Sequence, residues 1–514
     1  MFNLIKLSEP NLIFGHEQPM DDPRDGLTLF GPLRENAPFG INYGLIGTEA
    51  GIERFYRWTK IILHSSAHPE VSKRILWVPF PGFEEVFGIP FSSMASTERI
   101  IDSGALKIIL KEDDPYQRVY QTVKLYIDAI LDFYKRDDED VALWYVISPE
   151  SIFRDCRPKS AIDDPLKKIS KTIVKKRQEK ARMAYQSKHS QLFIFPEQEK
   201  DYYAYNFDND FRRQLKARLI MERIRNPIQI FRESTLTPGD FLDKWGNPER
   251  ELEPDSQLAW NSLSTTFYKA GGKPWKLNSV REGVCYLGMV FKQLPNHENK
   301  RFACCAAQMF LDSGDGVVFQ GAIGPWKSES REEYHVDEEA AAEIINRAVE
   351  AYKITFGKKE NPKEIFIHGR TFLNDNEWRG FSTVTNLGIK VVGVRIRPSG
   401  LRLYRPGKFP VLRGMANVET KNRGHLWSTG FIPRLRTFPH SGIPYPLEIE
   451  ICRGEEDILI VMEDILKLTK LNYNACHYAD GKPITLQFAD KIGDILTAGP
   501  IEKDKAPLPF KFYI

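Results

Sequence analysis

The sequence predicts an α/β protein made of two domains. Between residues 43 and 147, strand-like and helix-like segments alternate, which is typical of a parallel sheet covered on both faces. From about Leu277, three strand-like segments precede an alternation of helix and strand, which predicts a second sheet. At 514 residues the chain is too long for a typical single domain. We therefore expect one domain over residues 1–276 and another over residues 277–514.

Composition narrows the class of protein. With 42% hydrophobic and 27% charged residues, the chain has the make-up of an ordinary globular protein. Its net charge of +3 is small, so local basic patches would have to hold any nucleic acid. The first residues lack the order of a signal peptide, and no apolar stretch is long enough to cross a bilayer. The six cysteines lack metal-ligand or disulfide spacing, and the adjacent Cys304 and Cys305 favour buried free thiols. We expect a cytoplasmic protein.

The elements of the first domain are predicted from periodicity. An N-terminal segment up to about residue 40 is rich in proline, glycine and acidic turns. Residues 51–65 and 116–136 have the apolar spacing of helices, whereas residues 74–82 and 141–149 predict strands.

A basic insertion at residues 159–198 breaks this alternation. It carries many lysines and arginines among few acids and few large apolar groups. Two interpretations stay open, a solvated surface helix and an arm that contacts phosphates.

The second domain begins with three consecutive strands and a glycine-rich turn at Asp312–Gly316. Asp337 is expected to cap a helix that stops at Gly357. A strand, a helix and a strand follow. The predicted strands and helices cover residues 284–293, 301–311, 316–324, 338–355, 364–370, 376–385 and 389–397. This chain order is that of an RNase H-like fold.

Four long side chains in the first domain have spacings suited to one terminal phosphate. Arg212 and Lys216 are four apart in a helical segment and so share a face. Gln229 lies in a short apolar run that predicts a strand, and Lys269 ends the next helical segment. A strand packed between the two helices would bring all four to one anion. The alternatives are a basic helix face, a lysine favoured by a helix C-terminus, and a solvent-facing glutamine.

Seven short motifs, in their order along the chain, carry a resemblance to a known family. They are DPRDGLTLFGP, FPGFEEVFG, QLKARL, YKAGGKPWKL, LGMVFK, LTKLNYNAC and FADKIG. The chain resembles a short prokaryotic Argonaute, and within that family the SPARTA branch, which works with a TIR-APAZ protein. The resemblance implies a Rossmann-like MID domain followed by an RNase H-like PIWI domain.

The resemblance also implies roles for these residues. The 5′ phosphate of a guide RNA would be bound by Arg212, Lys216, Gln229 and Lys269, with Thr235 at the phosphate or first nucleotide. Lysine and arginine suit a terminal phosphate because charge-assisted hydrogen bonds to it are strong. Arg212 stands where many Argonautes have tyrosine. A Mg²⁺ ion at the phosphate would be held by Gln229 and the C-terminal carboxylate of Ile514.

The second domain lacks acids at the positions that matter for cleavage. An RNase H-like nuclease holds two Mg²⁺ ions with several carboxylates. The resemblance places Val290 and Gly369 at two of these positions and leaves only Asp490. We therefore expect a catalytically inactive PIWI domain. The other candidate groups are interpreted as structural, with Asp312 and Asp315 in a turn and His368 in the core or facing nucleic acid.

The function implied by the resemblance is RNA-guided recognition of single-stranded DNA, in defence against invading DNA such as plasmids. Target binding would trigger oligomerisation and NAD⁺ degradation by the TIR-APAZ protein. Three alternatives stay open. They are the same role with a SIR2-APAZ or nuclease-APAZ effector, an active guide-directed nuclease whose acids lie elsewhere, and a general single-strand binder.

Overall fold

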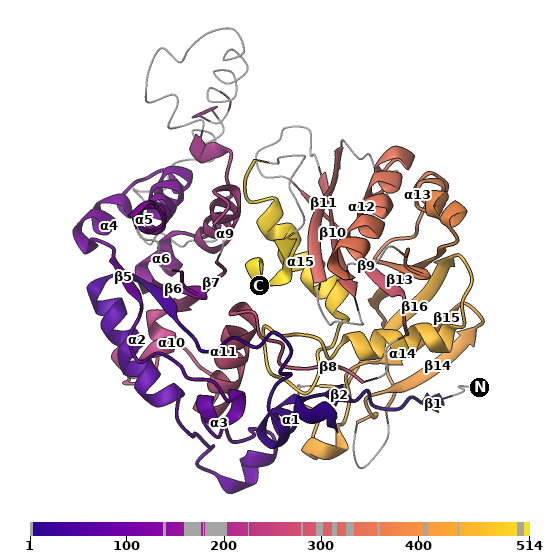
Figure 1. The fold of residues 1–514 in the computed structure, drawn as a ribbon, viewed down its shortest axis with the longest axis horizontal. Helices are drawn as coiled ribbons and strands as arrows, with labels where there is room; N and C mark the ends of the chain where they lie inside the picture. The colour runs from indigo at the N-terminus through magenta and orange to yellow at the C-terminus, as the bar shows by residue number, and fades with distance from the viewer. Residues whose placement is uncertain are drawn as a thin grey trace.

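The computed structural model shows two lobes, with the C-terminus between them (Figure 1). The structure describes residues 4–136, 140–158, 176–177, 179, 203–224, 226–278, 281–293, 302–310, 316–324, 334–356, 360–404, 410–439, 442–500 and 508–514. The basic insertion at 159–198 therefore lies almost entirely outside the described residues. So do Gly357 and the turn residues Asp312 and Asp315.

The first lobe is built on a four-stranded parallel sheet in the order β5–β4–β6–β7. Its strands are β4 (Tyr43–Gly47), β5 (Thr97–Ile100), β6 (Leu143–Ser148) and β7 (Ile228–Arg232). Successive residues of β6 pack into the two hydrophobic cores on opposite faces of the sheet. Tyr145 packs in the core that includes α2 (Glu49–Ile62) and α11 (Asp255–Lys269), whereas Trp144 packs in the core of α5 (Pro115–Arg136) and α9 (Phe211–Met221). The predicted parallel sheet, covered on both faces, is confirmed.

One predicted strand of this lobe is wrong. Residues 74–82 form the end of a 3-10 turn (Val71–Ile75) and a loop. Pro79 and Pro81 supply no backbone N–H, so this segment cannot sustain a central strand ladder. The smaller helices of the lobe are α3 (Phe83–Phe87), α4 (Ser103–Ile109), α6 (Glu150–Asp155) and α10 (Glu233–Leu236).

The second lobe contains a ten-stranded sheet in the order β1–β14–β15–β16–β13–β12–β9–β10–β11–β17. Antiparallel β9 (Val284–Gln293), β10 (Phe302–Phe310) and β11 (Gly316–Gly324) precede α12 (Glu338–Phe356), β12 (Glu364–Gly369), α13 (Asp375–Phe381) and β13 (Lys390–Pro398). This order confirms the predicted RNase H-like arrangement. The oxygen Oδ1 of Asp337 accepts from the amide of Ala340 at 2.8 Å, as expected of a helix cap.

The remaining elements extend this sheet and cover it. They are β14 (Met415–Thr420), β15 (Arg423–Trp427), β16 (Leu447–Arg453), α14 (Ile458–Leu468), α15 (Ile484–Leu496) and β17 (Leu508–Pro509). Helix α15 packs on β9 and β10 and also contacts α9 of the first lobe. No helix among the described residues is long and apolar enough to span a membrane. Cys156, Cys285 and Cys476 are buried free thiols, while the side chains of Cys304 and Cys305 lie outside the description.

The N-terminal segment joins the two lobes. We expected residues 1–276 to form one unit, but β1 (Leu4–Lys6) pairs with β14 at the edge of the second sheet. Next, β2 (Leu12–Ile13) pairs with β3 (Pro19–Met20) and with β8 (Lys276–Leu277), at the passage from one domain to the next. The relative placement of the two lobes therefore depends on this segment.

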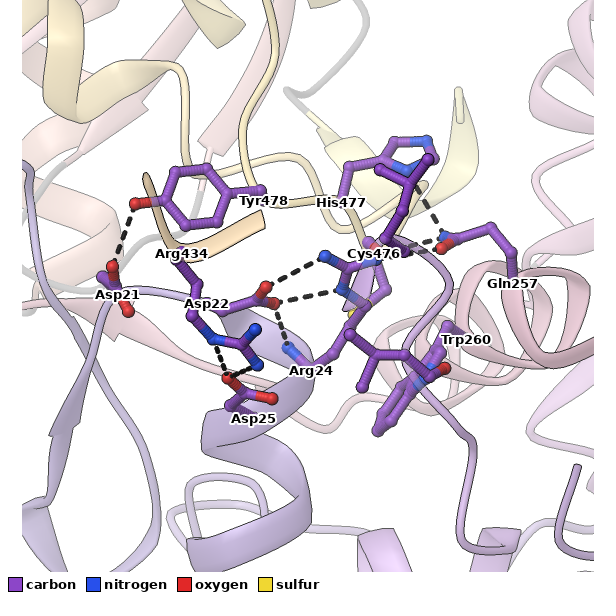
Figure 2. A network of polar contacts seen from close by, with 12 residues as sticks. Asp21, Asp22, Arg24, Asp25, Gln257, Trp260, Arg434, Cys476, His477 and Tyr478 are labelled. Atoms are coloured by element: carbon purple, nitrogen blue, oxygen red, sulfur yellow. Dashed lines mark hydrogen bonds and ion pairs between the residues drawn. The ribbon is translucent and has the colours of Figure 1, made fainter. Parts of the chain in front are cut away.

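A buried polar network fixes this junction (Figure 2). Asp22 caps α1 (Pro23–Phe30) and forms an ion pair with Arg24, from Nη2 to Oδ2 at 2.9 Å. The side chains of Asp22 and Arg24 are 0% and 4% exposed. Arg24 also donates to Oε1 of Gln257 on α11 at 3.3 Å, and Gln257 donates to the main-chain oxygen of Cys476 in the second lobe at 3.1 Å. The network thus connects three parts of the chain.

Replacing Arg24 with alanine is expected to lower the free energy of unfolding by about 3–5 kcal/mol, because Asp22 would remain as an unpaired buried carboxylate. Chemical denaturation of the two proteins measures this difference. The matched control is Arg434→Ala, which breaks the ion pair with Asp25 at a site where the Arg434 side chain is 36% exposed. The decrease in the free energy of unfolding for Arg434→Ala should stay within about 1 kcal/mol. Equal losses for the two variants would contradict the structural role of the buried pair.

Candidate nucleic-acid interface

A cavity of about 610 Å³ lies where the two lobes meet. Its wall includes residues of α6, α9, β7 and α10 from the first lobe, and Asn474, residues of α15 and Tyr513 from the second. The charged lining residues are Arg157, Arg212, Arg213, Arg232, Arg250 and Lys491 against Asp210 and Asp494. Six basic groups and two acids make this cavity suited to an anionic ligand.

Helix α9 carries two of the predicted cations, Arg212 and Lys216, at this junction. Asp210 caps the helix by accepting from the amide of Arg213 at 3.0 Å, and buried Phe211 and Leu215 hold one face against the core. Arg212 therefore lines the cavity, and none of the described residues accepts a hydrogen bond from its guanidinium. Burial lowers the pKa of Arg212, although Asp210 acts in the opposite direction. Lys216 follows one turn later.

Lys216 contacts the end of the chain. Its Nζ donates to the main-chain oxygens of Ile514 at 2.6 Å and Tyr513 at 3.2 Å, and Tyr513 is part of the cavity wall. The residue is 3% exposed. Burial lowers the pKa of Lys216 well below its usual value, and the nearby charges of Lys269, Arg212 and Lys491 lower it further. Positive charge is thus crowded here.

Lys269 and Gln229 meet on the neighbouring elements. Lys269 is the last residue of α11, and its Nζ donates to the main-chain oxygen of Ile228 at 2.8 Å and to Oε1 of Gln229 at 2.5 Å. Burial lowers the pKa of Lys269 well below its usual value, and Arg212 adds to this effect. An anion placed among these cations would relieve their mutual repulsion.

The structure therefore brings Arg212, Lys216, Gln229 and Lys269 together beside β7, an edge strand of the first sheet. Arg212 borders the cavity directly. Lys216 does not line the cavity but donates a hydrogen bond to Tyr513, which does. Gln229 and Lys269 are not part of the lining. Thr235 on α10 does line the cavity, where its hydroxyl accepts from Nη1 of Arg250 at 2.8 Å.

Five basic residues of the cavity were missed by sequence reasoning, namely Arg157, Arg213, Arg232, Arg250 and Lys491. Lys491 lies on α15, and burial followed by the charge of Arg212 lowers its pKa. Lys491 lies seven residues after Ile484 and three after Phe488, so it shares the apolar face of its helix, and a lysine on an apolar face was a signal that could have identified it. Arg250 lies in a loop without periodicity, so no local signal could have identified it.

A stacked group of side chains was also missed. The guanidinium carbons of Arg157 and Arg232 lie 4.2 and 3.5 Å from the ring centroid of Phe153, and all three residues line the cavity. Such cation–π contacts stabilise closely spaced guanidiniums without neutralising them. Arg232 is also paired with Glu150, so its charge is partly balanced beside the cavity.

The three positions that the resemblance assigns to a degenerate nuclease site lie in the second lobe. Val290 is on β9 and is 5% exposed, and Gly369 ends β12, the parallel neighbour of β9. Asp490 is on α15 and is paired with Arg370. Buried His368 has its Nδ1 3.0 Å from the hydroxyl of Thr485, and burial lowers its pKa to about 3, so it is neutral at physiological pH. Within the described ranges, no three His, Cys, Asp or Glu side chains gather as a metal site.

The two sheets and their order define the class of fold, which is the MID–PIWI portion of Argonaute structures. Clostridium butyricum Argonaute, bound to a guide DNA and a 19-mer target DNA, matches with a TM-score of 0.62 and 15% identity, over 100% of this chain and 55% of that chain. A. aeolicus Argonaute matches with a TM-score of 0.53 and 14% identity, over 98% of this chain and 54% of that chain. Drosophila Piwi matches with a TM-score of 0.54 and 10% identity, over 99% of this chain and 56% of that chain. The chain thus spans about half the length of these proteins. No protein-family model and no curated protein matches the sequence.

Proposed function

We propose that this protein binds a guide RNA by its 5′ phosphate and presents it for pairing with single-stranded target DNA. The observation that carries the proposal is the gathering of Arg212, Lys216, Lys269 and Lys491 beside a basic cavity between the two lobes. A terminal phosphate carries close to two negative charges and several acceptor oxygens, so it matches this set of donors.

The oxygens near the phosphate site fit the Mg²⁺ ion that the resemblance implies. The amide oxygen of Gln229 and the main-chain oxygen of Ile514 are hard donors of the kind this ion prefers, and Mg²⁺ is commonly completed by water and substrate phosphate. Each oxygen at present accepts from a lysine, Lys269 or Lys216. Gln229 and Ile514 would hold the ion, which would neutralise charge on the phosphate, while the freed ammonium groups turn to the phosphate oxygens.

Removal of Mg²⁺ tests this arrangement. With a chelator present, we expect the affinity for 5′-phosphorylated RNA to fall about tenfold, which corresponds to about 1.4 kcal/mol. The affinity for the same RNA with a 5′ hydroxyl should not change. Filter binding at constant ionic strength measures both. If the two RNAs respond equally to the chelator, the ion does not act at the phosphate.

We further propose that the second lobe recognises the paired target without cutting it. Of the degenerate positions, only Asp490 is acidic, and its carboxylate is paired with Arg370. Base pairing would read the sequence, while the protein contacts the backbone, as in other RNA-guided systems. The output would then come from a TIR-APAZ partner that degrades NAD⁺ after oligomerisation. This finer assignment rests on the resemblance of the sequence motifs.

Target capture tests the proposal as a whole. The protein loaded with a 5′-phosphorylated RNA should bind complementary single-stranded DNA at least about a hundredfold more tightly than a scrambled strand, and the DNA should stay intact. Adding the proposed TIR-APAZ partner should give NAD⁺ consumption that requires the matched target. Equal binding of matched and scrambled DNA would favour a general single-strand binder, and cleaved DNA would favour an active nuclease.

A further inference from the structure

The place where a nuclease would hold its metal ions carries two basic side chains. Strands β9 and β12 run parallel, with Gly288 opposite His368. Two residues further along lie Val290 and Arg370. Arg370 follows the end of β12, its side chain is 50% exposed, and it pairs with Asp490.

Lys292 of β9 completes this cluster. Its Nζ is 3.4 Å from Oδ1 of Asp490 and 3.0 Å from Oδ1 of Asp494, and its side chain is 23% exposed. Asp494 in turn pairs with Arg213 of α9 at 3.3 Å, and both residues line the cavity between the lobes. A continuous series of ion pairs therefore connects the degenerate nuclease position with the phosphate cavity.

The ion pairs at this place oppose the binding of a divalent cation. The carboxylate of Asp490 is engaged by both Arg370 and Lys292, so neither of its oxygens can bind a metal without breaking an ion pair. At Gly369, a Cβ atom would meet the main-chain oxygen of Thr371 at 3.7 Å, which is an ordinary van der Waals contact, so the glycine is not needed to avoid a clash. The guanidinium of Arg370 is half exposed, and an accessible guanidinium can bind a phosphate in a bidentate manner.

We propose that Arg370 and Lys292 form a second phosphate-binding site, which holds a backbone phosphodiester of the guide–target duplex where a nuclease would hold metal ions. The site rests on the proposed function, because that function brings a duplex to the second lobe. Either strand can supply the phosphodiester, and the chemistry is the same. When the phosphate binds, it replaces Asp490 as the partner of Arg370, which makes the interaction dependent on nucleic acid.

The test is the double variant Arg370→Ala with Lys292→Ala. For the guide-loaded protein, we expect the affinity for complementary DNA to fall about tenfold. The slope of log K against log salt should become shallower by roughly 0.7–0.9 for each phosphate that the variant no longer neutralises. The charge-retaining variant Arg370→Lys with Lys292→Arg should keep most of the affinity. Asp490→Asn, which releases Arg370, should raise it.

The control is Lys390→Ala. Lys390 is also an ion-paired lysine of this sheet, 2.9 Å from Glu456, but it begins β13, which is parallel to β12, and so lies at the opposite end of these strands. This variant should leave target affinity and salt slope unchanged. If the double variant lowers the affinity for the single guide RNA by the same factor, the phosphodiester belongs to the guide strand. If it alters neither affinity nor slope, the second site does not exist.

A preformed RNA–DNA duplex with a 5′ hydroxyl on its RNA strand separates this inference from the proposed function. Such a duplex cannot use the 5′-phosphate site, so any loss of its affinity in the double variant does not arise at that site. Weaker binding of this duplex by the double variant supports the inference even if the protein shows no preference for a 5′ phosphate. Unchanged binding overturns the inference, and a normal 5′-phosphate preference in the same protein would leave the proposed function standing.

Discussion

Replacing both Lys216 and Lys269 with methionine is expected to weaken binding of 5′-phosphorylated RNA by about 10²–10⁴-fold. Each lysine would supply a hydrogen bond to a charged acceptor, and such bonds contribute about 1.5–3 kcal/mol apiece. Methionine keeps most of the side-chain volume and removes the charge. Because both ammonium groups are buried among other cations, the loss of charge also removes repulsion in the free protein. The ratio of dissociation constants for 5′-hydroxyl and 5′-phosphorylated RNA measures the effect.

A matched control separates this result from general damage to a buried lysine. Lys470 is also buried, but it lies in the second lobe and pairs with Glu9 at 2.7 Å. Lys470→Met should lower the melting temperature and leave the ratio of the two dissociation constants unchanged. A double variant at 216 and 269 that remains folded and keeps the wild-type ratio would contradict the assignment of the phosphate site.

The affinity for the 5′ phosphate is expected to fall steeply as pH rises. In the free protein, burial and neighbouring cations hold the pKa values of Lys216 and Lys269 well below their usual value. A bound phosphate stabilises the charged ammonium and raises both pKa values, so binding takes up protons. The affinity then drops by up to about tenfold per pH unit for each proton taken up. The drop begins at the lowered pKa values of the free protein and ends at the raised values of the complex.

Two further effects of pH are expected, one on affinity and one on stability. Below a pH of about 6, protonation of the phosphate itself opposes binding, so the affinity passes through a maximum. In the free protein, the unfolded chain binds more protons at these lysines than the folded chain, so the two groups make stability rise with pH between the lowered pKa values and the usual ones. Titration calorimetry in buffers of different ionisation enthalpy counts the protons taken up. Proton release, or no exchange, would contradict charged lysines at the phosphate.

Much of the fold could be predicted because its long elements have clear periodicity. The helices that contain Lys216 and Lys269 and the buried strand at β6 all occur where the apolar spacing predicts them. The strand expected at residues 74–82 is wrong because two prolines interrupt the apolar run that predicted it. The short strand β1 was missed, since it has three residues and its partner lies about 400 residues away in sequence.

The candidate site was only partly predictable, for a related reason. Arg212, Lys216, Gln229 and Lys269 could be grouped because they lie on adjacent elements of one domain. Lys491 comes from the other domain, and its position beside Arg212 depends on how the lobes are joined. The network around Asp22 and Arg24 lies at that junction, and although both residues belong to one of the seven motifs, the local sequence cannot show that Arg24 contacts Gln257.

The most direct test compares one RNA with and without its 5′ phosphate. At fixed salt and pH, the wild-type protein should bind the phosphorylated strand at least about tenfold more tightly, a difference of about 1.4 kcal/mol. Arg212→Ala should reduce that preference, since Arg212 is the predicted cation that borders the cavity directly. Equal affinities of the wild-type protein for the two strands would contradict the claim that this cavity binds the end of a guide.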